Sequence, residues 1–159
     1  MSRSQYFYGG LLMAAIGGVM LFAYRTYAPL IGSTAPTTAQ FCGVSLTLDY
    51  ATTDAEREKG LGGRENVPDD YGMLFVFPKD DYYGFWMKDM LVPIDIFWLD
   101  NKGQVVFIVN DVDPSSYPDV FYPTVPIQYV LETTAGFARE HAITTGTPLL
   151  LKNFEHVSE

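Results

Sequence analysis

Every second residue from Val44 to Tyr50 is apolar or aromatic, and the residues between them are small or polar. This two-residue period is typical of a half-buried strand. A continuous apolar run over residues 73–77 ends at a proline, which indicates a strand buried on both faces. Shorter strands are predicted at residues 85–87 and 127–132, and residues 148–152 are expected to complete the sheet.

Two further strands are predicted to form a hairpin. Residues 94–99 and 104–109 are both rich in apolar residues. The sequence Asp-Asn-Lys-Gly, from Asp100 to Gly103, separates them and is typical of a tight turn. These two runs are therefore expected to pair as antiparallel neighbours.

Two short helices are expected between the strands. Thr53 and Glu56 have the spacing of a capping box at a helix N-terminus, and Gly60 is expected to end that helix. The second helix is predicted over residues 135–141. Many short strands with regular turn signals and two short helices predict a mainly β fold, in the form of a small barrel or sandwich.

A different pattern precedes this domain. Residues 6–24 are 19 consecutive uncharged residues, which as a helix would be about 28 Å long and would cross a hydrocarbon core. Aromatic residues flank both ends, as they do at membrane interfaces. The pattern predicts a transmembrane helix within an N-terminal anchor over residues 1–27, and Arg3 favours an N-inside, single-pass orientation with the domain outside the cytoplasm.

The main alternative for this segment is a cleaved signal peptide. Small residues suited to cleavage end at Ala28 and Ala35, but a proline follows each of them, and this favours an uncleaved anchor. Gly10, Ala14 and Gly18 recur on one helix face, where they could pack against a second membrane helix in an oligomer, although such residues are common in membrane helices.

The segment after the anchor is expected to be a linker over residues 28–39, because it is rich in Pro, Gly, Ser, Thr and Ala. The domain is then expected over residues 40–159. Residues 1–48 carry two arginines and no acid, whereas residues 49–159 carry 8 basic and 19 acidic residues. A net charge of −9 argues against nucleic-acid binding, since phosphate neutralisation needs an excess of Lys and Arg.

Metal and cofactor chemistry are not indicated by the sequence. A single cysteine, Cys42, excludes an internal disulfide and a cysteine-cluster metal site. Both histidines, His141 and His156, lie near the C-terminus without a spaced partner. No cofactor and no metal are therefore expected.

Five motifs occur in order along the chain: Arg57 to Arg64 (REKGLGGR), Gly72 to Phe77 (GMLFVF), Phe85 to Lys88 (FWMK), Pro93 to Asp95 (PID) and Tyr129 to Gly136 (YVLETTAG). Together they resemble the DUF192 family, a bacterial and archaeal group of unknown function. The resemblance covers about residues 44–152 and implies a small, β-rich, barrel-like fold but no established activity. One departure follows Lys88, where the family usually has Asn-Thr and this chain has Asp89 and Met90.

The charged residues of these motifs are the candidate ligand-binding site. Asp95 and Glu132 lie on apolar strands, and a buried carboxylate needs a partner, so both are expected to meet a motif cation. The set can be interpreted as a buried ion-pair network or as a cleft that binds a ligand. The candidate ligand-binding residues are Arg57, Arg64, Trp86, Lys88, Asp95 and Glu132.

Three functions are compatible with these observations. The first is a non-enzymatic binding or envelope-interaction module whose ligand is a glycan, a peptide or an envelope polymer. The second is a glycoside-type hydrolase with Asp95 and Glu132 as its weak candidate acid/base pair. The third is a structural protein that binds partners through its membrane helix and acidic surface.

Overall fold

The computed structural model describes residues 37–151. The predicted anchor, its orientation, the cleavage sites and the Gly10, Ala14 and Gly18 face lie outside the described residues. Among the residues that are described, no helix is both long and apolar enough to cross a membrane.

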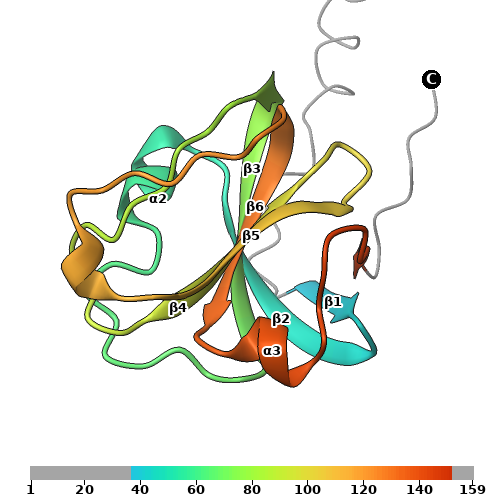
Figure 1. Cartoon of the computed structure of the whole chain (residues 1–159), viewed down its shortest axis with the longest axis horizontal. Helices are drawn as coiled ribbons and strands as arrows, with labels where there is room; N and C mark the ends of the chain where they lie inside the picture. The colour runs from blue at the N-terminus through green and yellow to red at the C-terminus, as the bar shows by residue number, and fades with distance from the viewer. Residues whose placement is uncertain (1–36, 152–159) are drawn as a thin grey trace, which may run out of the picture. The chain divides into compact units, whose positions relative to one another are not determined.

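One mixed sheet of seven strands makes up most of the described domain, in the order β5-β4-β6-β3-β2-β1-β7 (Figure 1). All neighbouring strands are antiparallel except β2 and β3. The strands are β1 (Thr37–Phe41), β2 (Val44–Ala51), β3 (Tyr71–Asp81), β4 (Ile94–Leu99), β5 (Val105–Val112), β6 (Ile127–Thr134) and β7 (Leu149–Leu151).

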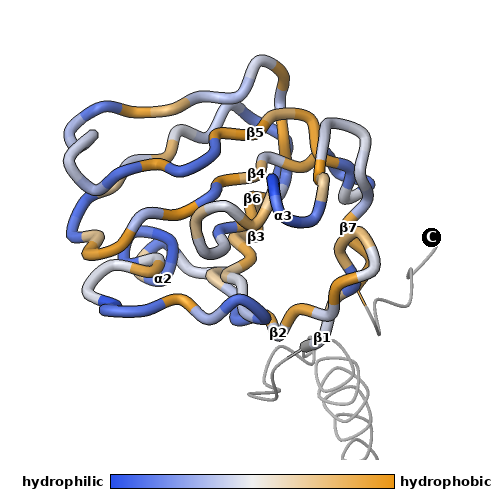
Figure 2. The backbone as a smooth tube through the Cα atoms, turned by 60° about the horizontal axis from the view of Figure 1, so that its bottom comes forward, coloured by the Kyte–Doolittle hydropathy of each residue, from blue (hydrophilic) through white to orange (hydrophobic). Residues whose placement is uncertain are grey.

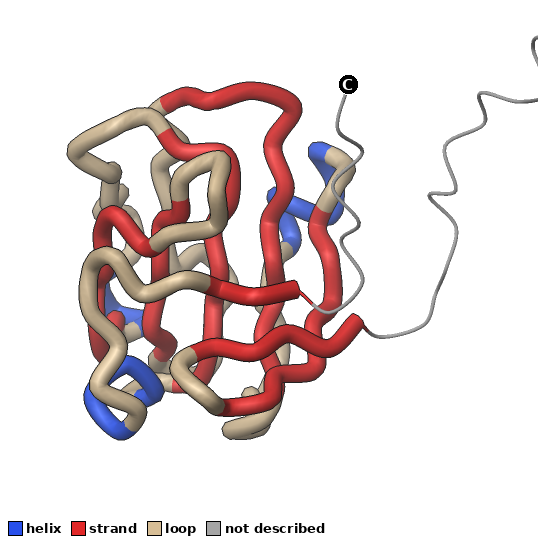
Figure 3. The backbone as a smooth tube through the Cα atoms, turned by 90° about the vertical axis from the view of Figure 1, so that its right-hand side faces the viewer, coloured by secondary structure: helices blue, strands red, loops and turns tan. Residues whose placement is uncertain are grey.

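The sheet is strongly curved (Figure 3), and an isolated bridge between Gln104 and Pro148 brings its outer strands β5 and β7 together at one end. The Val105 backbone N–H donates to the Thr147 carbonyl at 3.0 Å, and the Leu149 N–H donates to the Gly103 carbonyl at 2.9 Å. These bonds join the start of β5 to the segment that leads into β7. The predicted mainly β, barrel-like fold is thus confirmed as a half-barrel. Within residues 37–151 it carries two short α-helices and one 3-10 turn at Pro114–Ser116.

Helix α2 (Asp54–Lys59) connects the two parallel strands β2 and β3. Its predicted capping box is present: Thr53 accepts from the Glu56 N–H, and the Glu56 carboxylate accepts from the Thr53 N–H at 2.8 Å. The bonds from the Thr53 and Thr52 backbone N–H groups lower the pKa of Glu56 to about 2. The helix ends at Gly60 as predicted.

Both faces of the sheet are covered by apolar side chains, and hydrophobic residues concentrate along the central strands (Figure 2). One core contains Phe75, Ile96 and Trp98, and residues that follow α2 close it. The other contains Leu74, Phe97 and Leu131 and is covered by helix α3 (Phe137–Glu140). Because both faces are buried, strand β4 is buried along its whole length.

Two sequence predictions need correction. Strand β1 begins at Thr37, so residues 37–39 belong to the sheet and not to the linker; the sequence of this segment resembles a linker because its strand character comes from pairing with β2. The run 85–87 is not a strand: only Phe85 pairs, through an isolated bridge to Phe121.

Candidate functional site

Four of the six predicted site residues line one cleft, which we call the α2 cleft. It lies between the C-terminal part of α2, strand β3 and residues 83–90, and its volume is about 340 Å³. This is within the range of small-molecule sites. The four residues are Arg57, Trp86, Lys88 and Glu132.

Aromatic rings form much of the cleft wall. Phe77 stacks on Tyr83 with ring centroids 3.6 Å apart, and Phe75 meets Phe85 edge to face at 4.8 Å. Trp86 adds an indole that is 44% exposed, so it is available to a ligand. Apart from Trp86, sequence reasoning did not assign these rings to a site; the signal for them was the alternation of Phe75 and Phe77, which places both on one face of β3.

Glu132 lies in the wall of the cleft and is only 4% exposed. Its strand neighbours are Met73 on β3 and Ile96 on β4, neither of which offers a polar side-chain atom to the carboxyl group. Its Oε2 atom is buried without a hydrogen-bond partner among the described residues. Burial raises the pKa of Glu132 to about 8, against a smaller opposing effect of the Leu61 backbone N–H, so the group is largely neutral at pH 7.

Charged residues surround the mouth of the cleft. The Arg57 guanidinium donates to the Val76 carbonyl at 2.8 Å and pairs with Asp54, and it lies 5.2 Å above the Phe77 ring. It thereby fixes α2 against β3. Lys88 Nζ is 3.3 Å from the Oε1 atom of Glu58 in an exposed pair, and such pairs contribute little to stability.

The cleft also depends on the glycine that ends α2. Gly60 has φ +47° and ψ −134°, a conformation that L-residues rarely adopt. A Cβ atom there would be 3.1 Å from the Cζ atom of Phe75 and 3.6 Å from the Oε2 atom of Glu132. A side chain at position 60 would therefore crowd the Phe75 ring and contact the buried carboxyl group of Glu132.

Replacing Gly60 by alanine is expected to destabilise the protein by about 1–3 kcal/mol, because it adds backbone strain and crowds Phe75. Gly63→Ala is the matched control, since Gly63 also has a positive φ but has no atom within 4 Å of the added Cβ position. Thermal unfolding of both variants measures the difference. Equal losses of stability would show that crowding at the cleft contributes nothing.

Arg64 does not reach the cleft. Its guanidinium lies 3.2 Å from the Asp49 Oδ2 atom and 4.8 Å above the Tyr71 ring. The Tyr71 hydroxyl donates to the same Asp49 oxygen at 2.7 Å, and burial together with this bond raises the pKa of Tyr71. The three residues form a separate cluster between β2 and β3.

Asp95 lies on the opposite face of the sheet from Glu132. Strands β4 and β6 pair Asp95 with Thr133 and Ile96 with Glu132, and paired residues share a face. The Asp95 carboxylate is fully buried and accepts from the backbone N–H groups of Asp111 at 2.7 Å, Gly136 at 3.1 Å and Ala138 at 2.8 Å.

Two expectations about the carboxylates are therefore wrong. Asp95 meets backbone N–H groups and not Arg57, Arg64 or Lys88, so no buried ion-pair network joins the motif charges. The sheet also separates Asp95 from Glu132, which removes the geometry that an acid/base pair for glycoside hydrolysis requires. Asp95 instead holds the start of helix α3 against the sheet and binds the end of β5 to β4.

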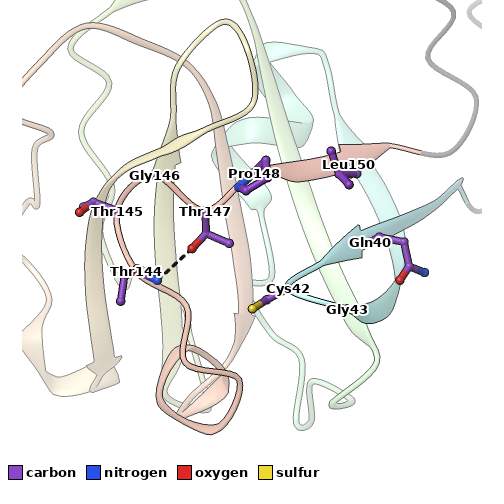
Figure 4. A pocket seen from close by; sticks show the side chains of 9 residues that line it. All are labelled: Gln40, Cys42, Gly43, Thr144, Thr145, Gly146, Thr147, Pro148 and Leu150. Carbon is purple, nitrogen blue, oxygen red and sulfur yellow. Dashed lines mark hydrogen bonds between the residues drawn. The ribbon is translucent and has the colours of Figure 1, made fainter.

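A second hollow, of about 490 Å³, lies between the β1–β2 turn and the segment before β7 (Figure 4). The Thr144 backbone N–H donates to the Thr147 hydroxyl at 3.2 Å on one side of it, and exposed Cys42 lies on the other. Its lining contains no charged side chain and neither of the buried unpaired polar atoms found among residues 37–151. It is therefore the weaker candidate for a ligand site.

Comparisons with known proteins agree with this fold. The family model DUF192, described as "Uncharacterized ACR", matches residues 37–151. The chain is similar to a crystal structure of a putative transcription regulator from Sinorhizobium meliloti 1021, with 25% identity and a TM-score of 0.69 over 76% of this chain and 98% of that one.

It is also similar to a protein of unknown function from Novosphingobium aromaticivorans DSM 12444. There the identity is 28% and the TM-score 0.66, over 72% of this chain and 82% of that one. No curated protein matches the chain. The comparisons thus identify related folds and assign no chemistry to the α2 cleft.

Proposed function

The chain belongs to the DUF192 family, whose members are described as uncharacterised, and from the geometry of its α2 cleft we propose that it is a non-enzymatic ligand-binding module. Glu132 is the observation that carries the proposal. A buried carboxyl group with an unpaired oxygen lowers the stability of a protein. Such a group in the wall of an aromatic cleft is typical of a site whose partner arrives with the ligand.

The proposed location is the outer side of a membrane. The uncharged segment 6–24 and Arg3 before it support an N-terminal anchor with the domain outside the cytoplasm. In that setting the ligand is a glycan, a peptide or an envelope polymer, and the exposed Trp86 ring offers a stacking surface to any of them.

Regulation of transcription is less well supported for this chain. The Sinorhizobium meliloti relative is described as a putative transcription regulator. The present chain has a net charge of −9, and a protein that binds DNA needs an excess of basic residues to neutralise phosphates.

A partner-binding protein acting through the Gly10, Ala14 and Gly18 face is the second proposal, supported by the spacing of those residues alone.

The binding proposal predicts protection of the full chain against heat by a ligand, because binding to the folded state alone raises the unfolding temperature. The probes are N-acetylglucosamine oligomers, a muramyl peptide, short peptides and uronic acid oligomers, each added at several concentrations. Saturable protection is expected from at least one class, and Trp86→Ala is expected to weaken it about tenfold, in line with the loss of one stacking contact.

The control for this experiment is Tyr117→Ala. Tyr117 is 50% exposed and is not part of the cleft, so its replacement is expected to leave protection unchanged. A panel that produces no shift in the wild-type protein would refute the binding proposal. Protection that is lost equally in both variants would place the site elsewhere.

A further inference from the structure

The charge around the α2 cleft is opposite in sign to that of the domain. Residues 49–159 carry more than twice as many acidic as basic residues. Around the cleft, however, the three cations Arg57, Lys59 and Lys88 outnumber the two acids of the mouth, Asp54 and Glu58. A locally positive mouth on an acidic domain favours a negatively charged ligand.

The two acids at the mouth neutralise two of these cations. Asp54 pairs with Arg57, and Glu58 pairs with Lys88. Lys59 makes no ion pair among the described residues, and it lies in the last turn of α2, directly before Gly60. One positive charge at the cleft is therefore not balanced by an ion pair within residues 37–151.

The protonation state of Glu132 decides whether its unpaired oxygen can donate a hydrogen bond to a ligand or only accept one. A neutral carboxyl group presents an O–H donor, whereas an ionised one would present only acceptors. The other titratable groups that line the cleft are Tyr83 and the five charged residues of the mouth, and the paired positions on β3 and β4 are Met73 and Ile96, which do not titrate. No cation that lines the cleft forms an ion pair with Glu132: Arg57, whose side chain is 16% exposed, pairs with Asp54, and Lys88 pairs with Glu58.

We infer that the α2 cleft binds a small, ring-bearing organic anion, with the neutral Glu132 carboxyl donating a hydrogen bond to it and Lys59 facing its negative charge. The ring lies against Trp86 and Phe85, and the anionic group accepts from the Glu132 Oε2 hydroxyl. The inference rests on the proposed ligand-binding function and narrows its ligand class. Two sources share this chemistry, namely an aromatic carboxylate and a uronic acid unit of a glycan.

The test is isothermal titration of the full chain with four probes at pH 7. Benzoate, benzyl alcohol and benzylammonium share one ring and differ in charge, and methyl glucuronide carries a carboxylate on a sugar ring. Benzoate or methyl glucuronide is expected to bind roughly tenfold or more tightly than benzyl alcohol, and benzylammonium most weakly. The tighter of the two carboxylates identifies the source of the ligand.

The pH dependence tests the role of Glu132 in the same experiment. Between pH 6 and pH 9 the affinity for the carboxylate is expected to fall about tenfold, because the neutral donor is lost as Glu132 ionises through a pKa of about 8. Glu132→Gln keeps an N–H donor and is expected to bind the carboxylate without this fall. Glu140→Gln, at an exposed acid on α3, is the control and is expected to behave like the wild type.

The outcomes separate the ligand class from the binding function. Tighter binding of benzylammonium than of both carboxylates, or affinity for the carboxylates that rises with pH, would overturn the inference and leave the α2 cleft as a binding site. A second result would also overturn only the inferred ligand class: none of the four probes binds, but an uncharged glycan or peptide protects the protein in a way that depends on Trp86. The binding function itself would then stand. Failure of every probe and of the whole panel would overturn the proposed function with it.

Discussion

Asp95→Ala is expected to destabilise the protein by about 3–5 kcal/mol, more than the loss of any other side chain of the predicted site. Three backbone N–H groups donate to this fully buried carboxylate, and hydrogen bonds to a charged acceptor contribute about 1.5–3 kcal/mol each, with less than full additivity. For a domain of this size the unfolding temperature falls by on the order of 10 °C or more.

Asp95→Asn is expected to cost nearly as much, although it conserves the shape of the side chain. Its amide –NH₂ group donates and cannot accept, so it faces a backbone N–H that also donates. Asp69→Asn is the control, because Asp69 is an exposed loop residue. A calorimetric unfolding temperature for either Asp95 variant within roughly 2–3 °C of the wild type, the effect of a surface substitution, would contradict the structural role of Asp95.

The second large effect concerns Glu132 and pH. In the folded state burial raises the pKa of Glu132 from 4.5 to about 8, so between these values the folded protein holds a proton that the unfolded chain has released. Stability therefore decreases as pH rises through this window, by about 1.4 kcal/mol per pH unit. The proton on Glu132 therefore stabilises the folded protein fully below pH 4.5, and this contribution to the free energy of unfolding is lost above about pH 8.

Glu132→Gln isolates this contribution, because the amide does not titrate. Between pH 5 and pH 8 the wild type is expected to lose about 4 kcal/mol of stability relative to Glu132→Gln. At pH 8 and above the variant is expected to be the more stable protein, as is found where a functional group lowers stability. Parallel curves of unfolding temperature against pH for the two proteins would contradict the buried, neutral state of Glu132.

The parts of the fold that were predictable are those with local signals. The capping box of Thr53 and Glu56, the helix end at Gly60 and the hairpin of β4 and β5 depend on residues close in sequence, and all three are present. Strand β1 pairs with its sequence neighbour β2 across a two-residue turn at Cys42 and Gly43, both of positive φ, but the linker-like composition of residues 37–39 outweighed this local signal. The parallel pairing of β2 with β3 joins strands that are distant in sequence, so no short sequence pattern predicts it.

For the candidate site, too, the sequence indicated the residues but not their positions in space. Sequence reasoning collected the charged motif residues but could not place Asp95 and Glu132 relative to the sheet, because a shift of one residue in strand register moves a side chain to the other face. The observed register of β4 with β6 puts Asp95 beside Thr133 and Glu132 beside Ile96. One acid thereby anchors α3, and the other faces the α2 cleft.

The two carboxylates also differ in how their buried oxygens are satisfied. Both oxygens of Asp95 accept backbone hydrogen bonds, so this acid has a complete structural explanation. The Oε2 atom of Glu132 has no partner among the described residues. Because of this contrast, we assign a structural role to Asp95 and a role in ligand binding to Glu132.

The most direct test of this assignment is the titration of the Glu132 carboxyl carbon by ¹³C NMR in the full chain, with Glu132→Gln to identify its signal. A midpoint near pH 8 is expected in the free protein. A higher midpoint is expected with benzoate or methyl glucuronide bound, since the bound anion favours the protonated acid. A midpoint near the ordinary value of 4.5 that neither carboxylate moves would contradict the assignment of Glu132 to ligand binding.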